Sequence, residues 1–142
     1  MSATDEVDEL IEHYQLALDA FMKGNPKPVQ VLFSHRDDAS LANPYGAPVR
    51  AWDEIAETME RAASTRRDGS FLGFETLAKY ATADLANVVE LERLESKVHG
   101  GEDMSPYALR VTMIFRPEDG EWKVVHRHAD QVMTIDPPIV QH

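Results

Sequence analysis

The chain has no cysteine, and this absence excludes disulfide bonds, thiolate metal ligands and a cysteine nucleophile. It also lacks any uninterrupted apolar run near the roughly 18 residues that a membrane-spanning helix needs. Basic residues are scarce, because 14 Lys and Arg stand against 25 Asp and Glu and give a net charge of −11. Nucleic acids and anionic membranes are bound by clustered basic side chains, so we expect neither as a partner.

The start of the chain, MSATDEVDEL, is acidic and lacks the basic-then-apolar order of a secretion signal. We therefore expect a cytoplasmic protein. The 142 residues, of which 43% are hydrophobic, are enough for one domain with a substantial core. We assign residues 1–133 to that domain and interpret residues 134–142, which contain paired prolines, as an extended C-terminal tail.

Helical spacing of apolar residues is confined to the first half of the chain. Apolar residues recur at three- and four-residue steps over residues 7–21, which predicts a first helix ending near Gly24. Asn25-Pro26 predicts the start of a short second helix. The spacing over residues 52–63 predicts a third helix.

The second half of the chain has the pattern of β-strands. After a brief strand near residues 39–42, four β-like runs cover residues 71–82, 86–98, 107–115 and 121–133. Their short connections predict an antiparallel meander. Helices followed by strands indicate an α+β fold, in which three N-terminal helices pack into a strongly curved, mainly antiparallel sheet.

The last run contains the strongest candidate for a site. In a regular strand every second side chain lies on the same face, and we expect this face to point into the interior. Its members are Trp122, Val124, His126, His128 and Asp130. A histidine beside an aspartate can serve as a base with its orienting partner, so we predict His126, His128 and Asp130 as catalytic residues. The alternatives are that they hydrogen-bond helix-end backbone or line a dimer edge. A metal would need further ligands that the sequence does not obviously supply, and we expect none.

Charged residues on the two preceding strands allow more than one interpretation. Arg110 shares a face with Thr112 and is predicted either to bind a carboxylate-bearing ligand or to pair with Glu90 or Glu92. Glu90 and Glu92 themselves belong to a mixed-charge strand that we expect to present a solvated or edge-covering face. Trp52 and Phe74 are predicted to serve as core or as pocket wall.

Several segments together resemble the nuclear transport factor 2-like superfamily, and within it the SnoaL-like proteins. They are the helix end FMKGN, the segment VLFSHRDDASLANPYG, the WDEI that opens the third helix, and DGEWKVVHRHAD. The closing strand is similar to the association domain of calmodulin-dependent protein kinase II. The resemblance implies a cystatin-like cone with an internal pocket, which is usually dimeric through the outer face of its sheet. It implies a fold far more strongly than an activity.

The resemblance also bears on residue roles. Steroid isomerases of this superfamily use a carboxylate as general base, and the matching position here is Asn43, which cannot ionise. Tyr14 lies on a helix face comparable to that of their oxyanion-donating tyrosine. Proton transfer of the steroid-isomerase kind is therefore not expected.

We predict a small-molecule-binding protein, with cofactor-independent acid-base catalysis of the isomerase, cyclase or dehydratase type on a small, partly apolar, oxygen-bearing substrate. The alternative is a non-catalytic ligand-binding or oligomerisation module. We expect no cofactor and a homodimer. The predicted pocket-lining residues are Tyr14, Asn43, Trp52, Phe74, Arg110 and Thr112.

Overall fold

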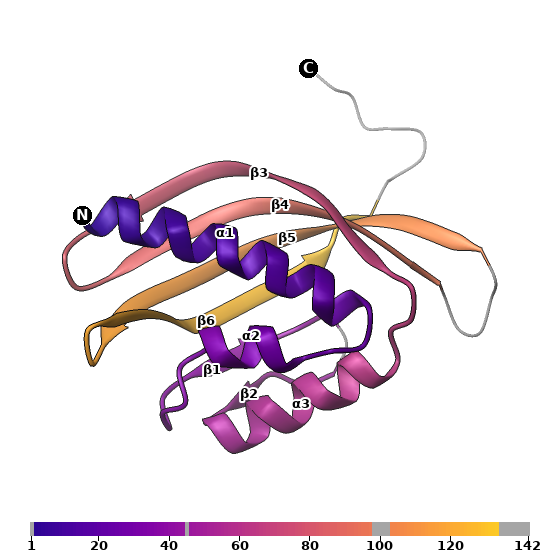
Figure 1. Cartoon of the computed structure of the whole chain (residues 1–142), viewed down its shortest axis with the longest axis horizontal. Helices are drawn as coiled ribbons and strands as arrows, with labels where there is room; N and C mark the ends of the chain where they lie inside the picture. Colours follow the sequence, from indigo (N-terminus) through magenta and orange to yellow (C-terminus); the bar gives the residue numbers. More distant parts are fainter. Residues whose placement is uncertain (1, 45, 98–102, 134–142) are drawn as a thin grey trace.

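The computed structural model describes residues 2–44, 46–97 and 103–133, and the predicted tail at 134–142 lies outside these ranges. Three helices precede the long strands, as the sequence predicted (Figure 1). The elements are α1 (Ala3–Met22), α2 (Lys27–Leu32), β1 (Ser40–Ala42), β2 (Val49–Arg50), α3 (Trp52–Ser64), β3 (Ser70–Ala81), β4 (Ala86–Lys97), β5 (Met104–Glu118) and β6 (Glu121–Gln131). No helix in the described ranges is long and apolar enough to cross a membrane.

The strands form one curved sheet in the order β2-β1-β6-β5-β4-β3 (Figure 1). The four long strands pair antiparallel in chain order, which confirms the predicted meander. The short β1 pairs parallel with β6, and β2 then extends the sheet antiparallel to β1. The fold is therefore α+β, with a mixed six-stranded sheet that does not close into a barrel.

The helices cover one face of this sheet (Figure 1). At the start of α1, the Ser2 hydroxyl accepts from the Asp5 amide while the Asp5 carboxylate accepts from the Ser2 amide, which caps the helix. The apolar stripe of α1 is buried against the sheet. Gly69 lets the chain turn from α3 into β3 close to the end of α1, because a Cβ there would lie 2.8 Å from the carbonyl oxygens of Met22 and Glu95.

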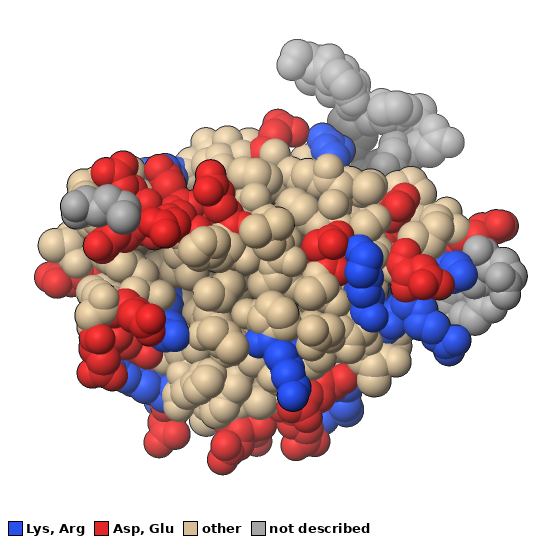
Figure 2. All heavy atoms as spheres, viewed as in Figure 1, with Lys and Arg blue, Asp and Glu red and all other residues tan. Residues whose placement is uncertain are grey.

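The β5–β6 turn places the last two strands in register. Asp119 and Gly120 both have positive φ, the conformation of a tight two-residue hairpin, and this turn is one of the short connections expected for the meander. Acidic side chains gather on the helix-bearing side over the start of α1 and around α3, and mostly uncharged surface lies between them (Figure 2).

Candidate functional site

A β-bulge in β6 overturns the predicted placement of the histidines. His126 pairs with Ile114 and Val124 pairs with Phe115, so Val125 is an extra residue between consecutive pairs. One extra residue reverses the alternation of side chains. Val124 faces the core, but beyond the bulge Arg127 and Ala129 face inward, where His126 and His128 were expected.

His126, His128 and Asp130 consequently lie on the outer face of the sheet. The Nδ1 atom of His126 is 2.8 Å from the Ser40 hydroxyl, and burial followed by the nearby His128 lowers the pKa of His126 below its usual value. His128 Nε2 lies 3.3 Å from Asp130 Oδ2, with both side chains about half exposed. The interior placement on which their predicted catalytic role depended is therefore wrong.

Arg110 and Thr112 share the outer face with these residues, because they are the cross-strand partners of Asp130 and His128. Arg110 is exposed and has no ion pair among the described residues, so the predicted pairing with Glu90 or Glu92 is not formed. Neither Arg110 nor Thr112 lines the interior.

The remaining predicted pocket residues are distributed over several parts of the fold. Tyr14 is fully buried on the inward face of α1. Trp52 packs against the core and stacks on His35 with ring centroids 3.8 Å apart. Phe74 lies on the edge strand β3 and is 41% exposed, and Asn43 is partly buried just after β1.

A buried ion pair occupies the interior at the position that the bulge gives to Arg127. The Arg127 guanidinium donates two hydrogen bonds to Glu92, of 2.9 Å and 2.7 Å, and the two residues are 4% and 0% exposed. The guanidinium carbon lies 5.3 Å from the centre of the Tyr14 ring. Although burial opposes its charge, Glu92 holds the pKa of Arg127 above its usual range. The expectation that Glu92 faces solvent is wrong.

Glu90 lies two residues before Glu92 on the same inward face of β4 and is only 1% exposed. Neither of its carboxyl oxygens accepts a hydrogen bond from a donor in the described part of the chain, and its protonated form hydrogen-bonds to the carboxylate of Glu92. Glu92 is itself committed to Arg127 and, when ionised, accepts hydrogen bonds without donating any. Burial, and then the negative charge of Glu92, raise the pKa of Glu90 to about 8. The expectation that Glu90 faces solvent is therefore also wrong.

Tyr14 on α1 completes this cluster of interior polar groups. Burial raises the pKa of Tyr14 to about 12, so its hydroxyl stays protonated and can donate a hydrogen bond. The amide nitrogen of Gln15, the next residue, is buried and has no partner among the described residues. We call Tyr14, Glu90, Glu92 and Arg127 the interior cluster.

The sequence contains a signal for this arrangement that the regular-strand reading missed. Strict alternation would place a polar residue after Val124, but Val125 is a second consecutive valine. Both valines are buried, so one of them departs from the alternation. A break in alternation of this kind is typical of a bulge.

The interior cluster is the chemically distinctive feature of the protein. A protonated carboxyl group with a pKa near 8 can donate a proton near neutral pH, and its ionised form can accept one. No three His, Asp or Glu side chains within the described residues come together in a way that could hold a metal ion.

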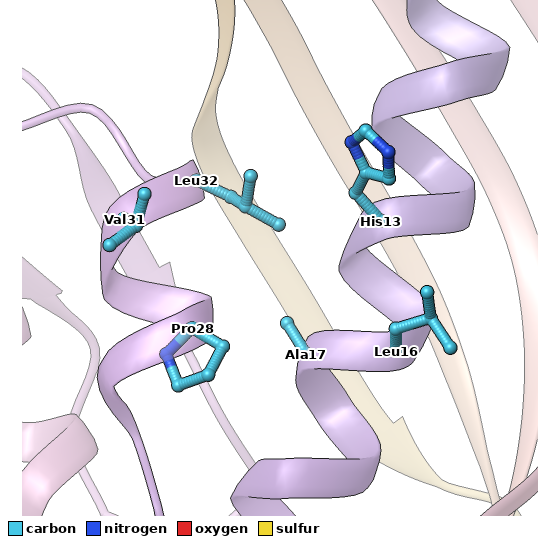
Figure 3. A pocket seen from close by; sticks show the side chains of 6 residues that line it. All are labelled: His13, Leu16, Ala17, Pro28, Val31 and Leu32. Carbon is cyan, nitrogen blue, oxygen red and sulfur yellow. The ribbon is translucent and has the colours of Figure 1, made fainter.

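Two hollows open at the surface of the described chain. One, of about 420 Å³, lies between α1 and α2 and is lined by His13, Leu16, Ala17, Pro28, Val31 and Leu32 (Figure 3). Ala17, one of these lining residues, also belongs to the buried core. The other hollow, of about 740 Å³, lies at the far end of the sheet between β3, β4, β5 and the residues after β6.

Comparison with known proteins assigns the fold to a family. Residues 11–134 match the SnoaL-like domain, and the chain therefore belongs to the SnoaL-like family. No curated protein matches the sequence significantly.

Three solved structures illustrate the breadth of the similar proteins. A proposed dehydratase of the nuclear transport factor 2-like family from Streptomyces avermitilis has a TM-score of 0.77 at 16% identity, over 93% of this chain and 98% of that one. A ketosteroid isomerase-like protein from Erwinia carotovora atroseptica has a TM-score of 0.74 at 18% identity, over 91% and 95%. A proposed calcium/calmodulin-dependent protein kinase type II association domain from Thiobacillus denitrificans has a TM-score of 0.71 at 18% identity, over 89% and 94%. At these identities the likeness shows the fold alone.

Proposed function

We propose that the protein binds a small, partly apolar molecule between α1 and the sheet, and that Glu90 exchanges a proton with it in cofactor-independent acid-base catalysis. The observation that carries this proposal is Glu90 itself, a fully buried carboxyl group whose hydrogen-bond contact among the described residues is with a second carboxyl group, Glu92, and not with a donor. Buried polar groups are normally paired, and strongly perturbed carboxyl groups concentrate at functional sites. A bound molecule would supply the donor that the ionised Glu90 carboxylate lacks.

Other groups support the same location. The protonated hydroxyl of Tyr14, which interacts electrostatically with Glu90, is a donor suited to an oxygen of the bound molecule, while Glu90 offers either a donor or an acceptor. The surrounding core is apolar, which matches a partly apolar ligand. We propose entry through the hollow between α1 and α2, because Ala17, one of its lining residues, belongs to the core (Figure 3).

Methionine methyl groups provide a direct test of this location. Met113 is fully buried, with its sulfur 3.6 Å from Arg127 Nη1, whereas Met133 lines the hollow at the far end of the sheet. A library of small oxygen- and nitrogen-bearing fragments would be screened against protein carrying ¹³C-methyl methionine. We expect ligands that shift the Met113 resonance, and Glu90→Gln should weaken their binding at least tenfold.

The matched control is Glu75→Gln, which makes the same chemical change at an exposed residue of β3. It should leave ligand binding unchanged. Ligands that shift Met133 and leave Met113 unchanged would contradict interior binding. Catalysis is then tested by incubating each ligand with the protein in D2O. If a carbon-bound proton of the ligand exchanges for deuterium, and Glu90→Gln abolishes this exchange, the protein is an enzyme. If no exchange occurs, the protein binds the ligand without turnover.

The outer sheet face favours a second role, namely association of two copies of this chain. Arg110 and Asp130 lie opposite each other on this face without an ion pair to one another in the structure. A two-fold axis that passes between two copies of this face would bring each Arg110 toward Asp130 of the partner copy. The contact would then be self-complementary. Ile114, also on this face and only partly buried in the single chain, would lie within the contact.

We therefore propose a homodimer through the outer face, in a protein that we expect from its sequence to be cytoplasmic. Light scattering after size-exclusion chromatography should give twice the chain mass of 16.0 kDa. Ile114→Glu should give the monomer mass, because it places charge in the middle of the contact. A wild-type protein that elutes as a monomer at high concentration would contradict the dimer.

A further inference from the structure

The interior cluster lacks one positive charge. It contains two carboxyl groups, Glu90 and Glu92, and one guanidinium, Arg127, whose Nη1 and Nη2 atoms both donate to Glu92. Charges buried in proteins are paired, because an isolated charge loses its hydration without compensation. The second carboxyl group, that of Glu90, therefore needs either a bound proton or a cation beside it.

We infer that the molecule bound in the interior carries a protonated amine, which forms an ion pair with the ionised carboxylate of Glu90. This inference rests on the proposed function, because it names the chemical class of the ligand at the same site. When the ammonium group enters, the Glu90 carboxyl group releases to solvent the proton that it had donated to Glu92, and the ammonium N–H groups donate to the two Glu90 oxygens, which accept from no donor among the described residues. The net charge of the cluster and ligand is then zero.

The neighbours of Glu90 favour a cation over an anion. On its own strand Glu92 contributes a negative charge, on α1 Tyr14 contributes a neutral hydroxyl, and on β6 Arg127 contributes a positive charge that Glu92 already neutralises. The residues paired with Glu90 on the adjacent strands, Thr76 and Val111, are uncharged. An anionic ligand would meet no unpaired cation in this cluster.

A metal cation is a poorer occupant than an amine. A metal needs several oxygen or nitrogen ligands arranged around it, and within the described residues no such group of three exists. An ammonium group is satisfied by fewer partners, because its three N–H donors can reach both oxygens of one carboxylate. Glu90 presents two such oxygens, and neither accepts a hydrogen bond from a donor among the described residues.

Two matched series of probes separate the ligand classes. The first is benzylamine, benzyl alcohol and benzoate, and the second is propylamine, 1-propanol and propionate, so that charge varies while size is nearly constant. Binding is followed through the ¹³C-methyl resonance of Met113 between pH 6 and 8.5. We expect the amines to bind and the carboxylates not to bind.

The pH dependence has a definite sign. The amine binds ionised Glu90, and with a pKa of about 8 the ionised fraction rises about tenfold from pH 6 to 7 and levels off above pH 8. Amine affinity should follow this fraction, and calorimetry in two buffers at pH 7 should detect close to one proton released per amine bound. Glu90→Gln should weaken amine binding at least tenfold and abolish its pH dependence, while Glu75→Gln should change neither.

Other outcomes overturn the inference. An alcohol could instead bind more tightly than the amine of equal size, with an affinity that stays constant up to pH 8. The ligand would then be a neutral molecule that accepts a hydrogen bond from protonated Glu90, and the proposed interior site would still stand. Binding of benzoate or propionate at Met113 would refute the charge argument directly. If no probe and no library fragment shifts Met113, Glu90 holds only a proton or a buried water, and the proposed function fails together with this inference.

Discussion

Replacing Arg127 with methionine should destabilise the protein strongly, because it leaves Glu92 as an uncompensated buried charge beside Glu90. Glu92 is 0% exposed and Arg127 is 4% exposed, so solvent screens their interaction little. Removing one partner of a buried ion pair typically lowers the free energy of unfolding by about 3–5 kcal/mol. Since whole domains are stable by about 5–15 kcal/mol, Arg127→Met should remain folded with a reduced margin.

Urea unfolding followed by circular dichroism at pH 7 measures this loss. With a slope of about 2 kcal/mol per molar urea, the transition midpoint should fall by roughly 2 M. The matched control is Arg93→Met, whose partner Glu75 is exposed, and it should change stability by less than about 1 kcal/mol. The double variant Glu92→Leu/Arg127→Met should recover most of the lost stability, because both charges are removed together.

Two results would refute this reasoning. A loss for Arg127→Met as small as that for Arg93→Met would mean that the ion pair is exposed in solution. A double variant as unstable as Arg127→Met alone would mean that the loss comes from the packing of the arginine stem and that the charge of Glu92 plays no part.

Two further predictions concern Glu90 and the outward histidines. As the pH rises from 5 to 8, the wild type should lose stability relative to Glu90→Gln by up to about 1.4 kcal/mol per pH unit. The reason is that folded Glu90 keeps a proton that the unfolded chain releases near its ordinary pKa of 4.5. If urea unfolding gives the same stability difference between the two proteins at every pH in this range, the burial of Glu90 is contradicted. His128→Ala should change stability by less than about 0.5 kcal/mol and leave the Met113 methyl resonance in place. If His128→Ala shifts this resonance as much as Glu90→Gln does, the outward position of His128 is contradicted.

The fold could be predicted from the sequence because its signals are local and repeated. The apolar spacing of the first helix, the Asn25-Pro26 helix start and the Asp119-Gly120 turn each specify a short segment independently of the rest. Helices followed by consecutive strands then define an α+β meander. The parallel pairing of β1 with β6 was not predicted, because it joins segments more than 80 residues apart without a local signal.

The candidate site was harder to predict because it depends on which face of β6 each side chain occupies. A single extra residue, Val125, exchanges the faces of every later residue in β6 and brings Arg127 inward in place of His126. The inward position of Arg127 also explains why Glu92 can be buried, since a buried carboxylate on β4 is tolerated only when a cation faces it. Reading each strand separately could not reveal such a pair, because each member makes sense only with the other.

The most direct test of the interior cluster is the ionisation of Glu90, measured as the pH dependence of its side-chain carboxyl ¹³C resonance. The resonance is assigned by its loss in Glu90→Gln. We predict a titration midpoint near pH 8, because burial and the adjacent Glu92 oppose ionisation. A midpoint near 4.5, the value of a solvated glutamate, would place Glu90 in water and contradict the proposed site.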